Sequence, residues 1–126
     1  MTTHLLNPKL KIESTTGTSE MLVTAIVTVH YGPQEENIIK ILGLKSKLKC
    51  RLWSDDADPD ADNPVFWFAT KTINKNDTYT FTKKVPRSTL DEDWEGNDEL
   101  YAKFVLSTDG FPITAKTQTL VQVGNY

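Results

Sequence analysis

Aspartate recurs at every second position in one short stretch of the chain, which comprises Asp56, Asp58, Asp60 and Asp62. Carboxylates at alternate positions suit calcium, because this cation binds about six to eight oxygen atoms and prefers charged ones. The EF-hand pattern is absent, since its sixth and twelfth positions would fall on Ala61 and Trp67 instead of Gly and Glu. The stretch therefore predicts either a calcium site of another kind or a solvated acidic loop.

Acidic residues are concentrated in two segments of the chain. Eleven of the 17 fall there, namely Asp55, Asp56, Asp58, Asp60 and Asp62 in the first segment and Asp91, Glu92, Asp93, Glu95, Asp98 and Glu99 in the second. Carboxylates held close together repel one another. A bound cation or a basic partner would relieve that repulsion, so both are candidate ligands of these segments.

Four cations also alternate along the chain, at Lys45, Lys47, Lys49 and Arg51. On an extended strand this spacing places all four side chains on one face. Such a row predicts contact with an acidic protein, including the acidic segments of another copy of this chain. The alternative interpretation is protection of a sheet edge, because exposed lysines deter unwanted strand pairing.

Three tryptophans, Trp53, Trp67 and Trp94, are candidates for stacking against a sugar ring. Trp94 is the strongest of them because it lies in a polar segment, and with the alternating aspartates it would suit a calcium-dependent carbohydrate-binding module. Trp67 lies between Phe66 and Phe68 and is expected in the core, whereas Trp53 at the end of the basic row is expected to be partly exposed. Alternatively, all three tryptophans pack locally.

Residues that could form a catalytic site are scarce. The chain has two histidines, His4 and His30, and one cysteine, Cys50, whose neighbours Leu48 and Leu52 on the same face mark it as a buried thiol. The sequence contains no glycine-rich phosphate loop, metalloprotease helix or CxxC pattern. Carboxylates crowded in open loops lack the apolar pocket that acid–base catalysis needs. We therefore expect a protein that is not an enzyme.

The composition is typical of a globular protein, since hydrophobic residues make up 38% and charged residues 25% of the 126 residues. The net charge of −3 disfavours nucleic-acid binding, which depends on a basic surface. No apolar run approaches the length of a membrane span, and residues 1–8 lack the features of a secretory signal. From the sequence as written we expect a loose leader over residues 1–8, a single domain over residues 9–126, and a soluble cytoplasmic protein.

One long alternating pattern identifies a central strand, whose predicted core-facing side consists of Met21, Val23, Ala25, Val27, Val29 and Tyr31. Similar patterns predict six further strands, over residues 9–13, 44–53, 65–73, 78–85, 100–106 and 113–123. Asp109 and Gly110 predict a tight hairpin turn before the last strand. Pro33 followed by acidic residues favours a short helix near 34–42, with a further strand as the alternative because isoleucine prefers extended backbone.

Seven strands, separated by turn signals, with at most one short helix predict an all-β fold. We expect a two-sheet antiparallel sandwich of immunoglobulin-like design, in which Tyr101 would be a corner tyrosine. An up-and-down barrel and a transthyretin-like sandwich remain alternatives. In the immunoglobulin-like arrangement the two acidic segments lie at the same end of the domain. The expected function is that of a non-catalytic module acting through protein contacts, and the alternative is a calcium-dependent binding module.

Overall fold

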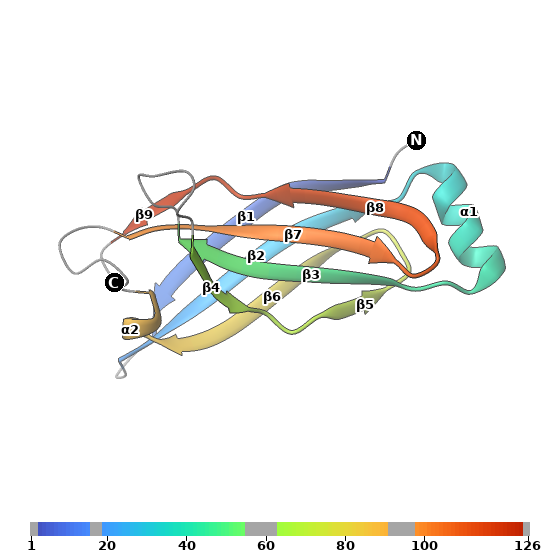
Figure 1. The fold of residues 1–126 in the computed structure, drawn as a ribbon. Helices are drawn as coiled ribbons and strands as arrows, with labels where there is room; N and C mark the ends of the chain where they lie inside the picture. Colours follow the sequence, from blue (N-terminus) through green and yellow to red (C-terminus); the bar gives the residue numbers. More distant parts are fainter. Residues whose placement is uncertain (1–2, 16–18, 55–62, 91–97, 125–126) are drawn as a thin grey trace.

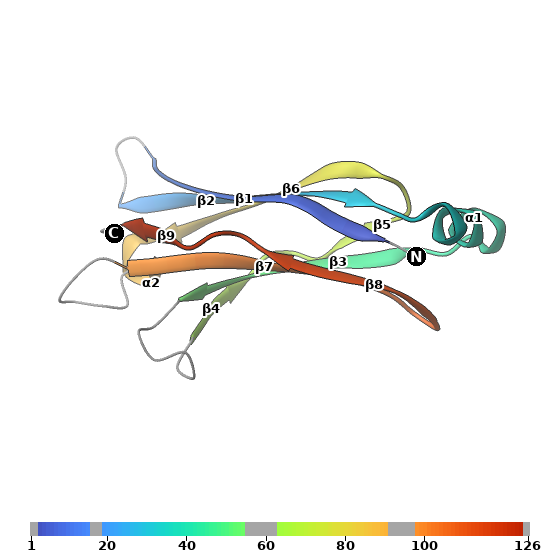
Figure 2. The same ribbon diagram turned by 90° about the horizontal axis from the view of Figure 1, so that it is seen from above.

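The computed structural model of the chain describes residues 3–15, 19–54, 63–90 and 98–124. These residues are mostly in β-strands, which form two antiparallel sheets. Figure 2 shows the two sheets as separate layers, one above the other, with helix α1 at one end. The prediction of a mostly β protein with two antiparallel sheets is therefore confirmed.

Sheet A has the strand order β1-β2-β6, and these strands span His4–Ser14, Glu20–His30 and Asp77–Pro86. The central strand β2 pairs along its length with both neighbours. Its predicted core-facing side, from Met21 to Tyr31, is buried throughout because these side chains point between the sheets. The expectation of a loose leader over residues 1–8 is wrong from His4 onward, since β1 begins there and Leu5 pairs with Val29.

Sheet B has the strand order β4-β3-β7-β8, with β5 also paired to β3 and β9 also paired to β7 (Figure 1). The six strands span Asn63–Trp67 (β4), Ser46–Ser54 (β3), Asp98–Thr108 (β7), Phe111–Gln118 (β8), Lys71–Ile73 (β5) and Gln122–Gly124 (β9). The predicted hairpin turn joins β7 to β8, and Gly110 takes a φ of 79°, which glycine tolerates because it has no Cβ atom. Alternate residues of β3 and β7 face the core, among them Leu48, Leu52 and Phe104.

Aromatic rings and a short chain of hydroxyl groups connect the two sheets. Phe81 of sheet A lies between Phe68 and Phe104, with ring centres 5.9 and 6.0 Å apart respectively. At the end of the core nearest α1, the Tyr31 hydroxyl donates a 2.8 Å hydrogen bond to Ser46 Oγ, which lies 2.7 Å from Thr108 Oγ1. These hydrogen bonds satisfy polar groups that would otherwise be buried without partners.

Helix α1 spans Pro33–Leu42, so the short helix favoured by the sequence is confirmed. Pro33 occupies its first turn, acids follow at the positive end of the helix dipole, and Lys40 bonds Glu36 at 3.2 Å. Gly43 ends the helix in the left-handed conformation. Of the four apolar residues in the helix only Ile39 is buried, because α1 lies at the end of the two sheets and covers neither face.

Two of the predicted strands are each divided in the structure. The stretch 65–73 forms β4 and β5 with a break between them, and its residues in or against the core are Val65, Phe66, Phe68 and Ile73. Trp67 consequently points outward and is 50% exposed, so its expected place in the core is wrong. The sequence pattern misled because the continuous apolar run over residues 65–69 gives no sign of which of its two faces lies against the core.

The last predicted strand, residues 113–123, forms β8 and β9. Between them, the Thr119 N–H donates to the Ala102 carbonyl, and Thr119 Oγ1 accepts a hydrogen bond from the Ala102 N–H. This local departure from the regular pairing of β7 and β8 changes which side chains face inward, so Val121 and Val123 are exposed although alternation predicts them in the core.

A single helical turn, α2 (Arg87–Leu90), follows β6 and buries Leu90; the sequence did not predict it.

Candidate functional site

The outer surface of sheet B carries cations from three neighbouring strands. We call this surface the basic face and define it by Lys47, Lys49 and Arg51 of β3, Lys103 of β7 and Lys116 of β8. The β3 residues alternate with the buried residues of that strand, so all three point away from the core. In the strand register Lys49 pairs with Val105, which pairs in turn with Lys116, while Arg51 pairs with Lys103.

Among the described residues, none of these five cations forms an ion pair with a carboxylate. The acidic residues of β7 and its turn, Asp98, Glu99 and Asp109, lie at the two ends of that strand. The net charge of the chain is −3, so this positive surface is a local departure from the charge of the whole protein. A face of this kind attracts negatively charged partners and orients them as they approach.

Arg51 is held by two tryptophans at one edge of the basic face. Its guanidinium carbon lies 4.6 Å from the ring centre of Trp67, which is its partner in β4, and 5.0 Å from that of Trp53. Lys103 Nζ lies 4.8 Å from the ring centre of Trp53. At these distances the cations are attracted to the negative faces of the indole rings. The tryptophans therefore position Arg51 and Lys103 without neutralising their charges.

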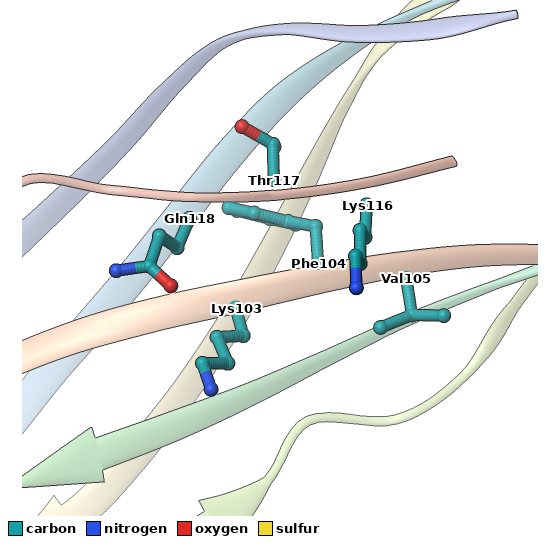
Figure 3. A pocket seen from close by; sticks show the side chains of 6 residues that line it. All are labelled: Lys103, Phe104, Val105, Lys116, Thr117 and Gln118. Carbon is teal, nitrogen blue, oxygen red and sulfur yellow. The ribbon is translucent and has the colours of Figure 1, made fainter.

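A shallow pocket of about 220 Å³ lies between β7 and β8 within the basic face. Figure 3 shows Lys103 and Lys116 on these neighbouring strands at its rim, with Val105 beside them. An adjoining pocket of about 290 Å³ shares Val105 and Lys116 and continues along the same two strands. Together the two pockets form a shallow groove along β7 and β8, with Val105 and Lys116 where they meet and Lys103 in the first pocket.

The structure brings together some of the predicted site residues and leaves others outside the described residues. Lys47, Lys49 and Arg51 lie on one face as predicted, and Lys45 is exposed one residue before β3 begins. The predicted metal ligands and the predicted sugar-stacking residue lie outside the described residues; these are Asp56, Asp58, Asp60, Asp62 and Trp94.

The described strand ends next to the two acidic segments lie close together. Ser54, the last residue of β3, pairs with Asn63 of β4 and with Leu100 of β7. The first segment connects Ser54 to Asn63, and the second leads into β7 just before Leu100. Both segments are therefore attached to the same end of sheet B.

Sequence reasoning missed Lys103, Lys116 and the outward position of Trp67 as parts of this surface. Lys103 and Lys116 do occupy outward positions in two predicted strands, so alternation alone could have placed each on an outer face. It could not show that both strands lie beside β3, because strand order depends on contacts between residues far apart in the sequence.

The candidate residues for a nucleophilic site, Cys50 and His30, lie in different sheets. Cys50 is buried, and burial raises the pKa of its thiol, so the thiol is protonated and unreactive at neutral pH. Cys50 faces the core between Leu48 and Leu52, whereas His30 is exposed at the end of β2 in the other sheet. Within the described ranges, no group of three or more His, Cys, Asp and Glu side chains is placed to hold a metal ion.

Two further observations concern membranes and relatives. In the described part of the chain, neither helix has the length and apolar character that crossing a membrane requires. Comparisons with protein-family models, with curated proteins and with solved structures give no match to this chain.

Proposed function

We propose that the protein is a non-catalytic binding module that acts through protein contacts, and that the basic face is its contact surface. The observation that carries this proposal is the half-exposed Trp67 stacked against Arg51 at one edge of the basic face. Tryptophan and arginine are the residue types that most often dominate binding energy at protein interfaces. The lysines of this face, which form no ion pair with another described residue, would supply attraction and orientation toward a negatively charged protein.

The strand order supports an immunoglobulin-like arrangement for this module. If β1, β2, β3, β6, β7 and β8 correspond to strands A, B, C, E, F and G, sheet A contains A-B-E and sheet B contains C-F-G. Strands that are adjacent in sequence are often in different sheets here, which an up-and-down barrel would not produce.

Affinity purification with a matched pair of variants tests the proposed function. The tagged protein is used as bait in an extract of its own source cells, beside Arg51→Gln/Trp67→Ser and the control Lys9→Gln/Lys84→Gln, which changes exposed lysines of sheet A. We expect a protein that is retained by the wild type and the control and lost with the face variant. Light scattering after size-exclusion chromatography at low and high salt tests self-association in the same set.

Two results would count against the proposal. One is a partner that the face variant retains as well as the wild type does. The other is a strict monomer at both salt concentrations for which no partner is recovered.

A calcium-dependent module, with a carbohydrate as the ligand, is the second candidate function. It is supported by the attachment of both acidic segments to the same end of sheet B, where Ser54 pairs with Asn63 and Leu100. Carboxylates from both segments would then be available to one cation. Thermal unfolding with and without calcium tests this candidate, as set out in the Discussion.

A further inference from the structure

The cations of the basic face form a regular lattice. Lys47, Lys49 and Arg51 recur at every second residue of β3, so their side chains are spaced about 6.6 to 6.8 Å apart along the strand. Across the sheet, Lys103 and Lys116 lie one and two strands away, at about 4.8 Å per strand. The positive charges are therefore spaced by the two distances common to all β-sheets, the distance between alternate residues along a strand and the distance between neighbouring strands.

An extended peptide has the same repeat along its own length, because its alternate side chains point to one side. A segment that carries a carboxylate at every second residue would thus place one carboxylate opposite each cation of β3. A helix would match this row less well, because the side chains on one of its faces recur at three and four residues and so do not keep the single spacing of alternate strand residues.

Arg51 is the cation best prepared to receive a carboxylate. Trp53 and Trp67 restrict its guanidinium, and no carboxylate among the described residues pairs with it. A carboxylate can accept two parallel hydrogen bonds from the guanidinium, which gives both strength and direction.

We propose that the basic face binds an extended acidic peptide segment of a partner protein, with alternate carboxylates along Lys47, Lys49 and Arg51. This inference rests on the proposed function and specifies the chemistry of the partner. Lys116 and Lys103 border the opposite side of the segment, and Val105 contacts its backbone or a small side chain within the groove. Arg51 anchors the end of the segment nearest Trp67.

A single-stranded nucleic acid is the main competing ligand, because it also combines regularly spaced negative charge with affinity for aromatic rings. The structure favours the peptide. Trp53 contacts both Arg51 and Lys103, and Trp67 contacts Arg51, so cations already occupy positions against these rings where bases would stack. The net charge of −3 also opposes general binding to phosphate chains.

The test compares two synthetic peptides of identical composition, each about ten residues long, at low salt. One alternates Asp and Thr, and the other has all its Asp residues in one block. Tryptophan fluorescence and calorimetry would measure the affinity of the whole protein for each. We expect the alternating peptide to bind about fivefold more tightly, since the blocked peptide loses its match to one or more cations.

Variants locate the binding site. Arg51→Gln should weaken binding of the alternating peptide by about tenfold, and Arg51→Lys should weaken it by a smaller factor because the charge remains but the paired hydrogen bonds do not. Lys9→Gln/Lys84→Gln removes two charges from sheet A and should leave the affinity unchanged. Circular dichroism and thermal unfolding would establish that each variant is folded.

The inference is overturned if the blocked peptide binds as tightly as the alternating one, or if the control variant weakens binding as much as Arg51→Gln does. It is also overturned if an oligothymidylate of similar length binds more tightly than either peptide. In all three cases the proposed function can survive, because loss of a cellular partner from the Arg51→Gln/Trp67→Ser variant does not depend on peptide spacing. Absence of that loss would remove the proposed function itself.

Discussion

The hydroxyl of Tyr31 donates a 2.8 Å hydrogen bond to Ser46 Oγ and thereby connects the end of β2 in sheet A to the start of β3 in sheet B. Both residues are buried, and Ser46 lies 2.7 Å from Thr108 Oγ1, so the chain of hydroxyl groups also reaches β7. Burial raises the pKa of Tyr31, and the hydrogen bond to Ser46 opposes that effect. The bond joins the two layers at the end of the core that α1 occupies.

Removal of the Tyr31 hydroxyl should lower the free energy of unfolding. We expect Tyr31→Phe to cost about 1 to 2 kcal/mol, because the buried Ser46 hydroxyl loses a donor while the packing of the ring is kept. Urea denaturation monitored by fluorescence would measure this cost. Tyr79→Phe is the control, since the Tyr79 hydroxyl bonds the Lys75 carbonyl at an exposed site and its loss should cost less. Equal costs for the two variants would contradict the structural role of the Tyr31 bond.

Stability should decline at alkaline pH through Cys50. Because burial raises the pKa of its thiol in the folded state, the thiolate favours unfolding. This contribution to stability is complete below the unfolded pKa of about 8.5 and is lost progressively as the pH rises above it, by up to about 1.4 kcal/mol per pH unit. Urea denaturation between about pH 7 and pH 10 should therefore show a steeper fall for the wild type than for Cys50→Ala. Parallel curves would show that the thiol is accessible to solvent.

The Thr119 side chain should be important for stability although it lies between two strands. Thr119→Val keeps the shape of the side chain but leaves the Ala102 N–H without its acceptor, at a cost of about 1 to 3 kcal/mol. Thr114→Val on β8 is the control, because Thr114 is exposed and valine suits a strand, so a change within about 0.5 kcal/mol is expected. Chemical denaturation of both variants would measure the difference. A neutral Thr119→Val variant would be incompatible with the observed hydrogen bond.

Trp67 and its neighbour Phe68 should respond very differently to truncation. Trp67→Ala removes an exposed ring and a cation–π contact with Arg51, at a cost of about 1 kcal/mol or less. Phe68→Ala leaves a cavity against Phe81 and should cost about 3 to 5 kcal/mol. Chemical denaturation would measure the loss in free energy of unfolding for each variant. A larger loss for Phe68→Ala than for Trp67→Ala agrees with the structure, whereas a larger loss for Trp67→Ala would agree with the sequence-based expectation that Trp67 lies in the core.

Calcium should raise the melting temperature if the second candidate function is right. A ligand that binds the folded state at about a hundred times its dissociation constant adds about 2.7 kcal/mol of stability, which corresponds to a shift of several degrees. The shift should be absent with magnesium and lost in Asp58→Asn/Asp60→Asn, while a glycan array tests the carbohydrate. No shift at millimolar calcium would exclude the metal, and the protein-binding proposal would be unaffected.

Local patterns in the sequence were sufficient to predict much of the secondary structure. Alternation from Met21 to Tyr31 identified β2 and its buried side, and Pro33 with the acids after it identified α1. The Asp109 and Gly110 turn was equally clear. Each of these signals depends only on residues close to one another in the sequence, so a single sequence is enough to detect them.

The sequence by itself determined the β character of the chain, the buried side of its long strands, and the row of cations on β3, because these follow from the alternation of side chains along an extended backbone. Only the tertiary structure decided that Lys103 and Lys116 lie beside that row and that Trp67 stacks on Arg51 at the surface. It also decided the inward positions near Thr119, where one pair of hydrogen bonds shifts the pattern. Such arrangements depend on pairing between strands up to about half the chain apart, and local residue types do not encode that choice.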